Sequence, residues 1–359
     1  MSAFIIAAYR TPIVPRGGAF ASLALHDLTS APILACLETA NIAPDQVDEL
    51  ILSNALGAGG NPARIAALAS GLPETVAGLS IDRQCCGGLD TLMLAKALIS
   101  SGQAEIVLAG GAETYSRRPL RAHPNPEGGA AIPYDQAPFT PWPDRDPAMS
   151  EAADVLAQTL GISHEAQDAW AVNSHQKARL AQTRMRAEIV SPIAGITDDP
   201  FTRNLTPALA ARAPQITGSV TAANTSVAAD GAAFCLVVSE RIAKHAARAL
   251  RILDGATIGG TPNLPGLAPV AAIRKIAPPD LSLTEIMEAY AAQAIACVHG
   301  ADLDPETVNV GGGSLARGHP IGASGAVLAV RLFHELKTGN GLAAIAAAGG
   351  IGTAVTFQA

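Results

Sequence analysis

The stretch Asp82-Arg83-Gln84-Cys85-Cys86-Gly87-Gly88-Leu89 joins two segments of different pattern. An apolar, strand-like run over residues 76–81 precedes it, and a segment with helical periodicity follows over residues 88–100. A cysteine at such a strand-to-helix turn lies beside the free N–H groups and the positive dipole end of the helix. This environment predicts a lowered thiol pKa at Cys85 and hence a nucleophilic thiolate. The alternative is that Cys85 and Cys86 are small residues that fill a tight, buried turn.

Composition limits the classes of protein to which the chain can belong. It has 359 residues, of which 49% are hydrophobic and 4% aromatic, so it is long enough for two or three domains with a large core. The net charge of −7 argues against a nucleic-acid partner. No apolar run is long enough to predict a transmembrane helix or a membrane partner. The first ten residues lack a basic region before their apolar run, so we interpret them as a strand and not as a signal peptide.

The five cysteines indicate reduced thiols and a cytoplasmic protein. Their number is odd and their spacing is irregular, which does not suit a disulfide framework. No cysteine or histidine spacing suits a zinc site, so we expect no metal. Cys36, Cys235 and Cys297 lie in runs of alanine, leucine and valine, where we expect them to fill the core.

Strand and helix patterns alternate along residues 1–112 and predict a mostly parallel sheet with helices on both faces. Residues 113–218 are rich in proline and arginine, apart from a polar helical stretch at 150–187, and predict an inserted segment that covers the sheet. The sheet pattern then resumes. Its predicted elements are strands at 219–222, 231–238, 251–255, 307–310 and 342–347, and helices near 268–276 and 284–298. We therefore expect an N-terminal half (1–112 and 219–247), a cover segment (113–218) and a C-terminal half (248–359).

An internal repeat relates the two halves. In the first, Gly88 opens a helix and a strand ends at Gly110, 22 residues later. In the second, Gly325 opens a helix and a strand ends at Gly349, 24 residues later. Two related halves that lie side by side would bring their equivalent turns together at the interface, where clefts usually form.

The turn before the second helix contains Gly318-His319-Pro320, so this histidine has little conformational freedom. A neutral imidazole there would accept a thiol proton, whereas a charged one would stabilise a thiolate. The alternative is a structural turn histidine bonded to the backbone. Because Cys85 occupies the equivalent turn of the other half, we favour a cysteine–histidine catalytic pair.

These motifs resemble the thiolase family over nearly the whole chain. The resemblance depends on their order and spacing together, since any single glycine-rich match would be weak. The motifs are Asp82-Arg83-Gln84-Cys85 with Gly88-Leu89, Gly110-Gly111-Ala112-Glu113, Ser174-His175-Gln176-Lys177, Val220-Thr221-Ala222 with Asn224 and Ser226, Asp230-Gly231-Ala232-Ala233, and Gly318-His319-Pro320-Ile321-Gly322-Ala323-Ser324-Gly325.

The resemblance implies a fold and an activity. The fold would be the α/β thiolase fold, with two similar mixed-sheet βαβ halves in an α/β/α/β/α arrangement and an inserted loop domain. The activity would be condensation or thiolytic cleavage of a 3-ketoacyl-CoA by an acyltransferase. Coenzyme A would enter as substrate or product and no further cofactor would be needed. The protein would be a homodimer or homotetramer.

The resemblance also implies roles for single residues. Cys85 would carry the acyl group, and His319 would activate it and contribute to an oxyanion hole. Four further residues would contact the CoA or acyl group: Ser226, Met149, Tyr290 (where the family usually has phenylalanine) and Gly349. Candidate contacts for the CoA phosphates are Arg117, Arg118, Arg184 and Arg203, although exposed arginines are more often surface charges.

Two positions depart from the family pattern. Met287 replaces an asparagine that normally holds a water in the oxyanion hole, and a thioether has no N–H to donate. Losing one such donor costs roughly 3–4 kcal/mol of transition-state stabilisation. Ala346 replaces the cysteine that moves a proton on the second substrate, a function typically worth about 10²–10⁴-fold in rate.

Three functions therefore stay open. The first is a thiolase-type acyltransferase, which is favoured because both the cysteine and the histidine turns are complete. The second is a non-standard Cys/His acyltransferase or thioesterase that passes its acyl group to water, an amine, an alcohol or an already nucleophilic carbon. The third is a partner subunit without turnover of its own.

Overall fold

The computed structural model describes residues 1–57 and 59–359. The strands are β1 (Ala3–Arg10), β2 (Val14–Pro15), β3 (Glu49–Ser53), β4 (Leu79–Ile81), β5 (Ile106–Glu113), β6 (Arg121–His123), β7 (Ile132–Tyr134), β8 (Gln215–Thr217), β9 (Val220–Thr221), β10 (Ala229–Ser239), β11 (Leu250–Gly259), β12 (Leu281–Ile286), β13 (Asn340–Ala347) and β14 (Ile351–Gln358). The helices are α1 (Leu25–Ala40), α2 (Pro62–Ala69), α3 (Gly87–Ser100), α4 (Met149–Leu160), α5 (His164–Met185), α6 (Pro207–Ala210), α7 (Glu240–Ala243), α8 (Ala268–Ile276), α9 (Ala291–Gly300), α10 (Ser314–Arg317) and α11 (Ile321–Glu335). Short 3₁₀ turns are η1 (Pro44–Gln46), η2 (Gln84–Cys86), η3 (Pro143–Arg145) and η4 (Pro265–Leu267).

The described residues form one large mixed sheet whose two halves repeat the same arrangement. Its order is β12-β13-β14-β11-β1-β10-β5-β3-β4, and β2 pairs with β10 beside this path. In the first half, β5 pairs with antiparallel β10 on one side and parallel β3 on the other. In the second half, β13 pairs in the same way with antiparallel β14 and parallel β12. The halves are joined where β1 pairs with β11 over three residues.

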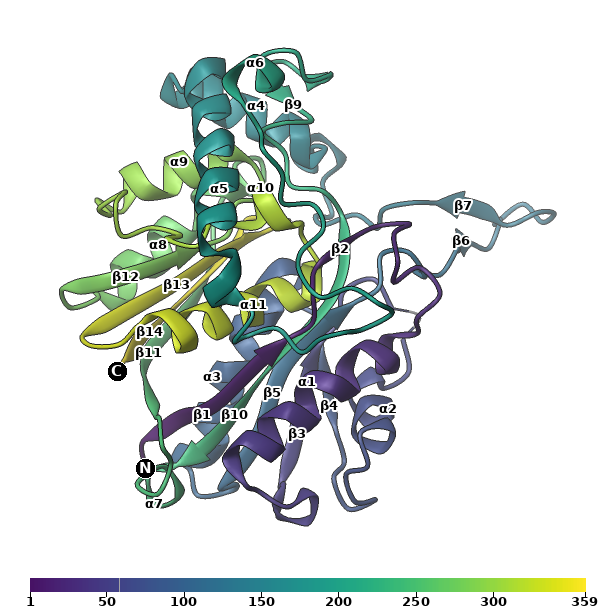
Figure 1. Ribbon diagram of the computed structural model, residues 1–359. Helices are drawn as coiled ribbons and strands as arrows, with labels where there is room; N and C mark the ends of the chain where they lie inside the picture. The colour runs from purple at the N-terminus through teal and green to yellow at the C-terminus, as the bar shows by residue number, and fades with distance from the viewer. Residues whose placement is uncertain (58) are drawn as a thin grey trace.

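The helices form three layers around the two half-sheets (Figure 1). Helices α3 and α11 share one hydrophobic cluster with residues of both halves, so they form the central layer. Helices α1 and α2 cover the outer face of the first half, while α8 and α9 cover that of the second. All residues from 322 to 333 in α11 are buried, including the polar Ser324 and Arg331, as expected for a helix packed on every side. This is the layered α/β arrangement that the sequence predicts, but the sheet is mixed and not mostly parallel, because β10, β1, β11 and β14 pair antiparallel.

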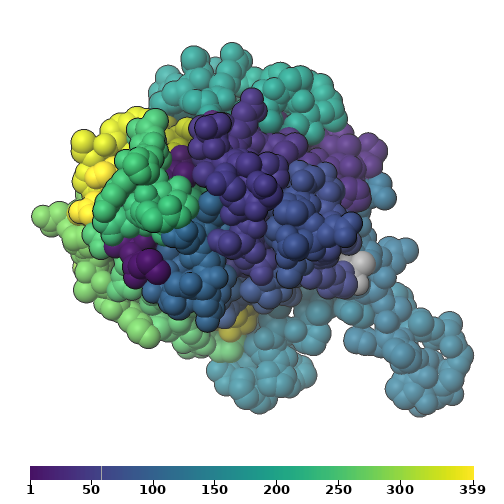
Figure 2. All heavy atoms as spheres, turned by 90° about the horizontal axis from the view of Figure 1, so that it is seen from below, coloured from purple at the N-terminus to yellow at the C-terminus, as the bar shows by residue number. Residues whose placement is uncertain are grey.

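The cover segment contains helices and long loops. The predicted helical stretch 150–187 is two helices, α4 and α5, separated at Gly161, which adopts a left-handed φ of 65°. The β6–β7 hairpin extends away from the body and stands as a separate lobe in the space-filling view (Figures 1 and 2). Among the described residues, no helix is both long enough and apolar enough to cross a lipid bilayer.

Three predicted elements differ in the structure. The residues predicted as a helix over 284–298 divide into strand β12 and helix α9, because a short buried apolar run has the same pattern in either state. The strand predicted at 307–310 is reduced to a single parallel bridge between Val308 and Thr284 of β12. This bridge occupies the place that β4 takes beside β3 in the other half. The strand predicted at 219–222 is β9, which pairs with β8 in a separate small sheet and not with the large one.

Candidate active site

The cysteine turn is held in a conformation that few residues adopt. After β4 the chain enters η2, and Gln84 takes a left-handed φ of 50° immediately before Cys85. The Asp82 carboxylate accepts a hydrogen bond of 2.8 Å from the Gln84 backbone N–H. This contact closes the turn and places Cys85 at the start of α3.

The histidine turn is equally constrained. Gly318 has a φ of 116°, and a Cβ at this position would lie 2.8 Å from the Cβ of Ala229. Only glycine fits such a position without strain. The His319 backbone N–H donates a hydrogen bond of 2.8 Å to the carbonyl of Val227, which ties the turn to the segment before β10.

The two turns meet, as the repeat predicts. The Sγ of Cys85 lies 3.1 Å from the Nε2 of His319, within hydrogen-bond distance. The other ring nitrogen, Nδ1, lies 2.7 Å from the Oγ of Ser324 in α11. When Nδ1 carries the proton and donates it to Ser324, Nε2 is left as an acceptor for the thiol proton. The arrangement is therefore that of a nucleophile, a base and a residue that orients the base.

The expected low pKa of the cysteine is wrong. Burial raises the pKa of the Cys85 thiol to about 12, and the carboxylates of Glu113 and Asp82 act in the same direction. Burial likewise lowers the pKa of His319 to about 4. The resting pair is thus a neutral thiol beside a neutral imidazole. At this site the cost of removing the thiolate from water exceeds the stabilisation that the helix dipole gives it.

Cys85 and His319 open into a cavity of about 400 Å³ between the two halves and the cover segment. Its lining includes three of the other predicted site residues, Ser226, Met149 and Tyr290. The remaining lining residues are Gln84, Tyr115, Gln136, Phe139, Ala148, Ser150, Ala152, Ala153, Leu156, Ala228, Pro265, Gly266, Ala289, Gln293, Ile321, Ala346, Ala347 and Ala348. Gly349, the fourth of these predicted residues, comes directly after Ala348 in the chain but does not line the cavity. A Cβ added at this glycine would face the carbonyl of Phe139.

The two departures from the family pattern occupy different places. Ala346 lines the cavity, so its methyl group is part of the wall. Met287 is 1% exposed, lies outside the cavity lining and packs in the central hydrophobic cluster. Cys86 is fully buried, with its Sγ 3.4 Å from the carbonyl oxygen of Ile345, and so faces away from the cavity.

Sequence reasoning did not identify two residues that support the pair. Ser324 orients His319, and its place five residues later on the helix that follows the turn is the signal that could have revealed it. Glu113 ends β5 and accepts hydrogen bonds from the backbone of the loop after β3 and from Gly322 N–H at the start of α11. These hydrogen bonds make the Glu113 carboxylate a link between the two halves. Burial raises the pKa of this carboxylate to about 7.

The four arginines considered for phosphate contacts lie outside the cavity lining. Arg118 pairs with Asp135 and Arg184 with Glu335, so the charge of each is already matched within the chain. Their role in binding CoA stays a prediction. Within residues 1–57 and 59–359, no group of three or more histidine, cysteine or carboxylate side chains is arranged to hold a metal ion.

Comparison with known proteins agrees with the fold and with the sequence motifs. Residues 3–241 match the family described as the N-terminal domain of thiolase, and residues 247–359 match its C-terminal domain. The chain is 40% identical over 380 residues to the putative acetyl-CoA C-acetyltransferase YhfS of Bacillus subtilis, covering 100% of this chain and 99% of the relative. It is 38% identical over 377 residues to a probable acetyl-CoA acyltransferase of Staphylococcus aureus strain COL, covering 96% of each.

Solved structures give the same result. The acetyl-CoA acetyltransferase of Bacillus anthracis superposes with a TM-score of 0.91 at 33% identity, covering 99% of this chain and 98% of the other. The Acat5 thiolase of Ascaris suum, solved in complex with coenzyme A, superposes with a TM-score of 0.90 at 28% identity, and each chain is covered in full (100%). The chain belongs to the thiolase family.

Proposed function

We propose that this chain is a thiolase-type acyl-CoA acyltransferase that carries its acyl group on Cys85. The observation that supports this most directly is the 3.1 Å contact between Cys85 Sγ and His319 Nε2 at the wall of an open cavity. Family membership supports the acyl-CoA substrate class. Coenzyme A enters as substrate or product, and the proposal requires no resident cofactor.

Acyl loading needs only groups that line the cavity. The thiol proton of Cys85 passes to His319 Nε2 while the sulfur attacks the thioester carbonyl carbon. The bond between that carbon and the CoA sulfur then breaks, and the proton held on His319 goes to the departing CoA thiolate. The products are acyl-Cys85 and free CoA. Because both groups are neutral at rest, the proton transfer accompanies the attack and is not completed before it.

The test is acylation of the purified chain by acetyl-CoA, followed by acid quench and mass mapping of the peptide that contains residue 85. We expect an acetyl adduct on Cys85 and slow but measurable thiolysis of a 3-ketoacyl-CoA. Both should disappear in Cys85→Ala, because Cys85 is the nucleophile on the Nε2 side of His319, whereas Ser324 lies on its Nδ1. The neighbour offers a matched control: Cys86→Ala also removes one thiol, but one that faces the core, so the adduct should persist. An adduct or turnover that survives Cys85→Ala would contradict the proposal.

A second candidate is acyl transfer without carbon-acid chemistry. The observation that favours it is Ala346, whose methyl group stands where the family has a proton-transferring cysteine. The acyl group would then leave Cys85 for water, an amine, an alcohol or an already nucleophilic carbon. In that case acyl-Cys85 forms, but neither condensation nor cleavage of a 3-ketoacyl-CoA follows. A chain that never accepts an acyl group by itself would instead support the third alternative, a partner subunit without turnover.

Assembly and location complete the proposal. We infer a homodimer or homotetramer, supported by β4 at the edge of the large sheet and by the exposure of its Leu79 (43%). Light scattering of the purified chain would measure the mass of the assembly, and a monomer would contradict this inference. We also infer a cytoplasmic location, supported by five cysteines that are all unpaired.

A further inference from the structure

The cavity contains a polar group at a position where the family usually has none. Ala346 contributes a methyl group to the wall, and Met287 contributes nothing to it because its side chain lies in the core. The wall therefore has neither the asparagine nor the second cysteine that the family uses on the second substrate. Tyr290, which stands where a phenylalanine is usual, adds a hydroxyl to the same wall.

The backbone on both sides of Tyr290 is fixed. The residue lies immediately before α9 in an extended conformation and forms a bridge with Thr225. The carbonyl of Ala289 accepts a hydrogen bond of 3.0 Å from Ser226 N–H, and the carbonyl of Asn224 accepts one of 2.9 Å from Ala291 N–H. The backbone of Tyr290 is thus fixed by the strand-like segment that also carries Ser226, and both residues line the cavity.

The hydroxyl of Tyr290 is available to a ligand. Tyr290 lines the cavity together with Cys85 and Tyr115, whereas the Tyr9 hydroxyl is already bonded to Thr39. Burial is the main cause that raises the pKa of Tyr290 to about 12, and the nearby Cys85 and Tyr115 act in the same direction. The phenol therefore stays protonated at neutral pH. It is suited to donate a hydrogen bond to a developing oxyanion and unsuited to act as a base.

We propose that Tyr290 is a further catalytic residue, whose hydroxyl donates a hydrogen bond to the thioester oxygen of the second substrate when that oxygen gains enolate character. This inference rests on the proposed function. In the cleavage direction, the Cys85 sulfur attacks C3 of a 3-ketoacyl-CoA and the thiol proton passes to His319. The C2–C3 bond then breaks, and its electron pair moves into the thioester as an enolate bonded to Tyr290. C2 finally takes the proton from His319, which leaves acetyl-CoA, formed from C1 and C2, and the shortened acyl group on Cys85.

Such a donor acts in the carbon–carbon step and not in loading, where no enolate forms. The hydroxyl thus supplies the stabilisation that the asparagine-held water gives in the family pattern, by direct contact instead of through a water. Donors aimed at a developing oxyanion are a recurrent source of catalysis, and a protonated tyrosine is one of the groups that serve in this way.

The test compares Tyr290→Phe with the wild-type chain in two assays, acylation of Cys85 by acetyl-CoA and cleavage of a 3-ketoacyl-CoA. The variant keeps the ring and its packing and loses one oxygen. We expect kcat for cleavage to fall by about 10²-fold, the usual effect of removing one oxyanion donor. Acylation should stay within about threefold. Tyr134→Phe makes the same change in the β6–β7 hairpin, outside the cavity lining, and should leave both rates unchanged.

The outcomes separate this inference from the function on which it rests. Equal cleavage rates in Tyr290→Phe and wild type would overturn the inference while acyl-Cys85 upheld the proposed function. An equal fall in both assays would also overturn it, since the hydroxyl would not be specific to the second substrate. Wild-type acylation without any cleavage would overturn it as well. Absence of acyl-Cys85 in the wild type would instead overturn the proposed function, and the inference with it.

Discussion

Neither member of the Cys85–His319 pair carries a charge at neutral pH, because burial acts on both in the direction of neutrality. A helix N-terminus stabilises an anion by about 0.3–1 kcal/mol at an exposed site. A rise in the thiol pKa from 9.0 to about 12 corresponds to roughly 4 kcal/mol against the thiolate. Desolvation therefore determines the resting state, and attack by the sulfur depends on simultaneous proton transfer to His319.

The neutral pair predicts an unusual pH dependence for acyl loading. The pKa of His319 is about 4, so the imidazole remains a proton acceptor down to that pH. We expect the rate of acyl-Cys85 formation to be flat between about pH 5.5 and 8 and to fall only on approach to pH 4. The measurement is quenched-flow acylation by acetyl-CoA followed by mass mapping. A loss of rate with a midpoint near 6.5, the ordinary histidine value, would contradict it.

At the scale of the elements, the site depends on the crossing of α3 and α11. A Cβ on Gly88 would lie 2.5 Å from the backbone nitrogen of Ala326, and one on Gly325 would lie 2.4 Å from that of Leu89. The two equivalent helices thus cross backbone to backbone at equivalent glycines. This close approach sets the separation of the turns that carry Cys85 and His319.

Gly88→Ala should therefore damage both stability and the site. The added methyl group meets backbone and not a flexible side chain, so the helices must separate at a cost of roughly 1–3 kcal/mol in the free energy of unfolding. We also expect slower acylation of Cys85, because the sulfur and the imidazole move apart. Denaturant unfolding and the acylation assay measure the two effects.

The matched control is Gly259→Ala at the end of β11, where an added Cβ has no neighbour within 4 Å. It should change stability by no more than about 0.5 kcal/mol, the usual limit for surface substitutions. Wild-type behaviour in Gly88→Ala would show that the crossing tolerates separation and that it does not set the geometry of the pair.

At the scale of the whole molecule, the sequence predicts those features that depend on local residue patterns. The glycine turns and the repeat predict the two halves, the central helices and the meeting of Cys85 with His319. The pKa of Cys85 could not be predicted, because burial depends on chain segments distant in sequence. Strand β12 was mistaken for a helix because a short apolar run does not distinguish the two states. The direction in which Met287 points also depends on packing and not on its place in a motif.

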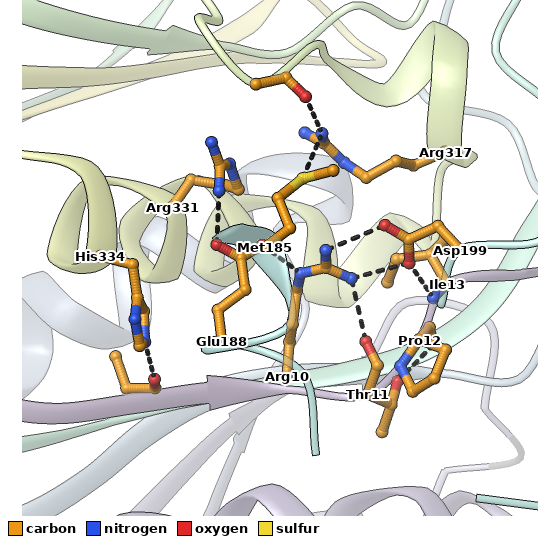
Figure 3. A network of polar contacts seen from close by, with 12 residues as sticks. Arg10, Thr11, Pro12, Ile13, Met185, Glu188, Asp199, Arg317, Arg331 and His334 are labelled. Atoms are coloured by element: carbon orange, nitrogen blue, oxygen red, sulfur yellow. Dashed lines mark hydrogen bonds and ion pairs between the residues drawn. The ribbon is translucent and has the colours of Figure 1, made fainter. Parts of the chain in front are cut away.

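A buried charge network holds the cover segment onto the two halves (Figure 3). Glu188, in the cover segment, binds Arg10 of β1 at 2.7 Å and Arg331 of α11 at 2.5 Å. Asp199, also from the cover segment, accepts two further hydrogen bonds from Arg10. The side chains of Glu188 and both arginines are fully buried, so each charge depends on its partners.

Glu188→Gln should consequently destabilise the whole molecule. The variant keeps the shape of the side chain but leaves two buried guanidinium groups with less compensation, at a cost of roughly 3–5 kcal/mol. Burial alone would raise the pKa of Glu188, but Arg331 and Arg10 lower it to about 2. Because the folded pKa lies below the unfolded value of 4.5, this stabilisation is complete above that value and is lost as pH falls toward 2. The difference between wild type and variant should thus be constant above about pH 5 and shrink below it.

Urea unfolding at several pH values tests this prediction, with Asp198→Asn as the matched control. Asp198 pairs with Arg186 at 3.0 Å, but that arginine side chain is 60% exposed, so the pair lies largely in water. Exposed pairs contribute about 0–1 kcal/mol, and the control should differ little from wild type. If Glu188→Gln proved as stable as this control, the charge of Glu188 would contribute nothing to the attachment of the cover segment, which Asp199 and the apolar contacts would maintain.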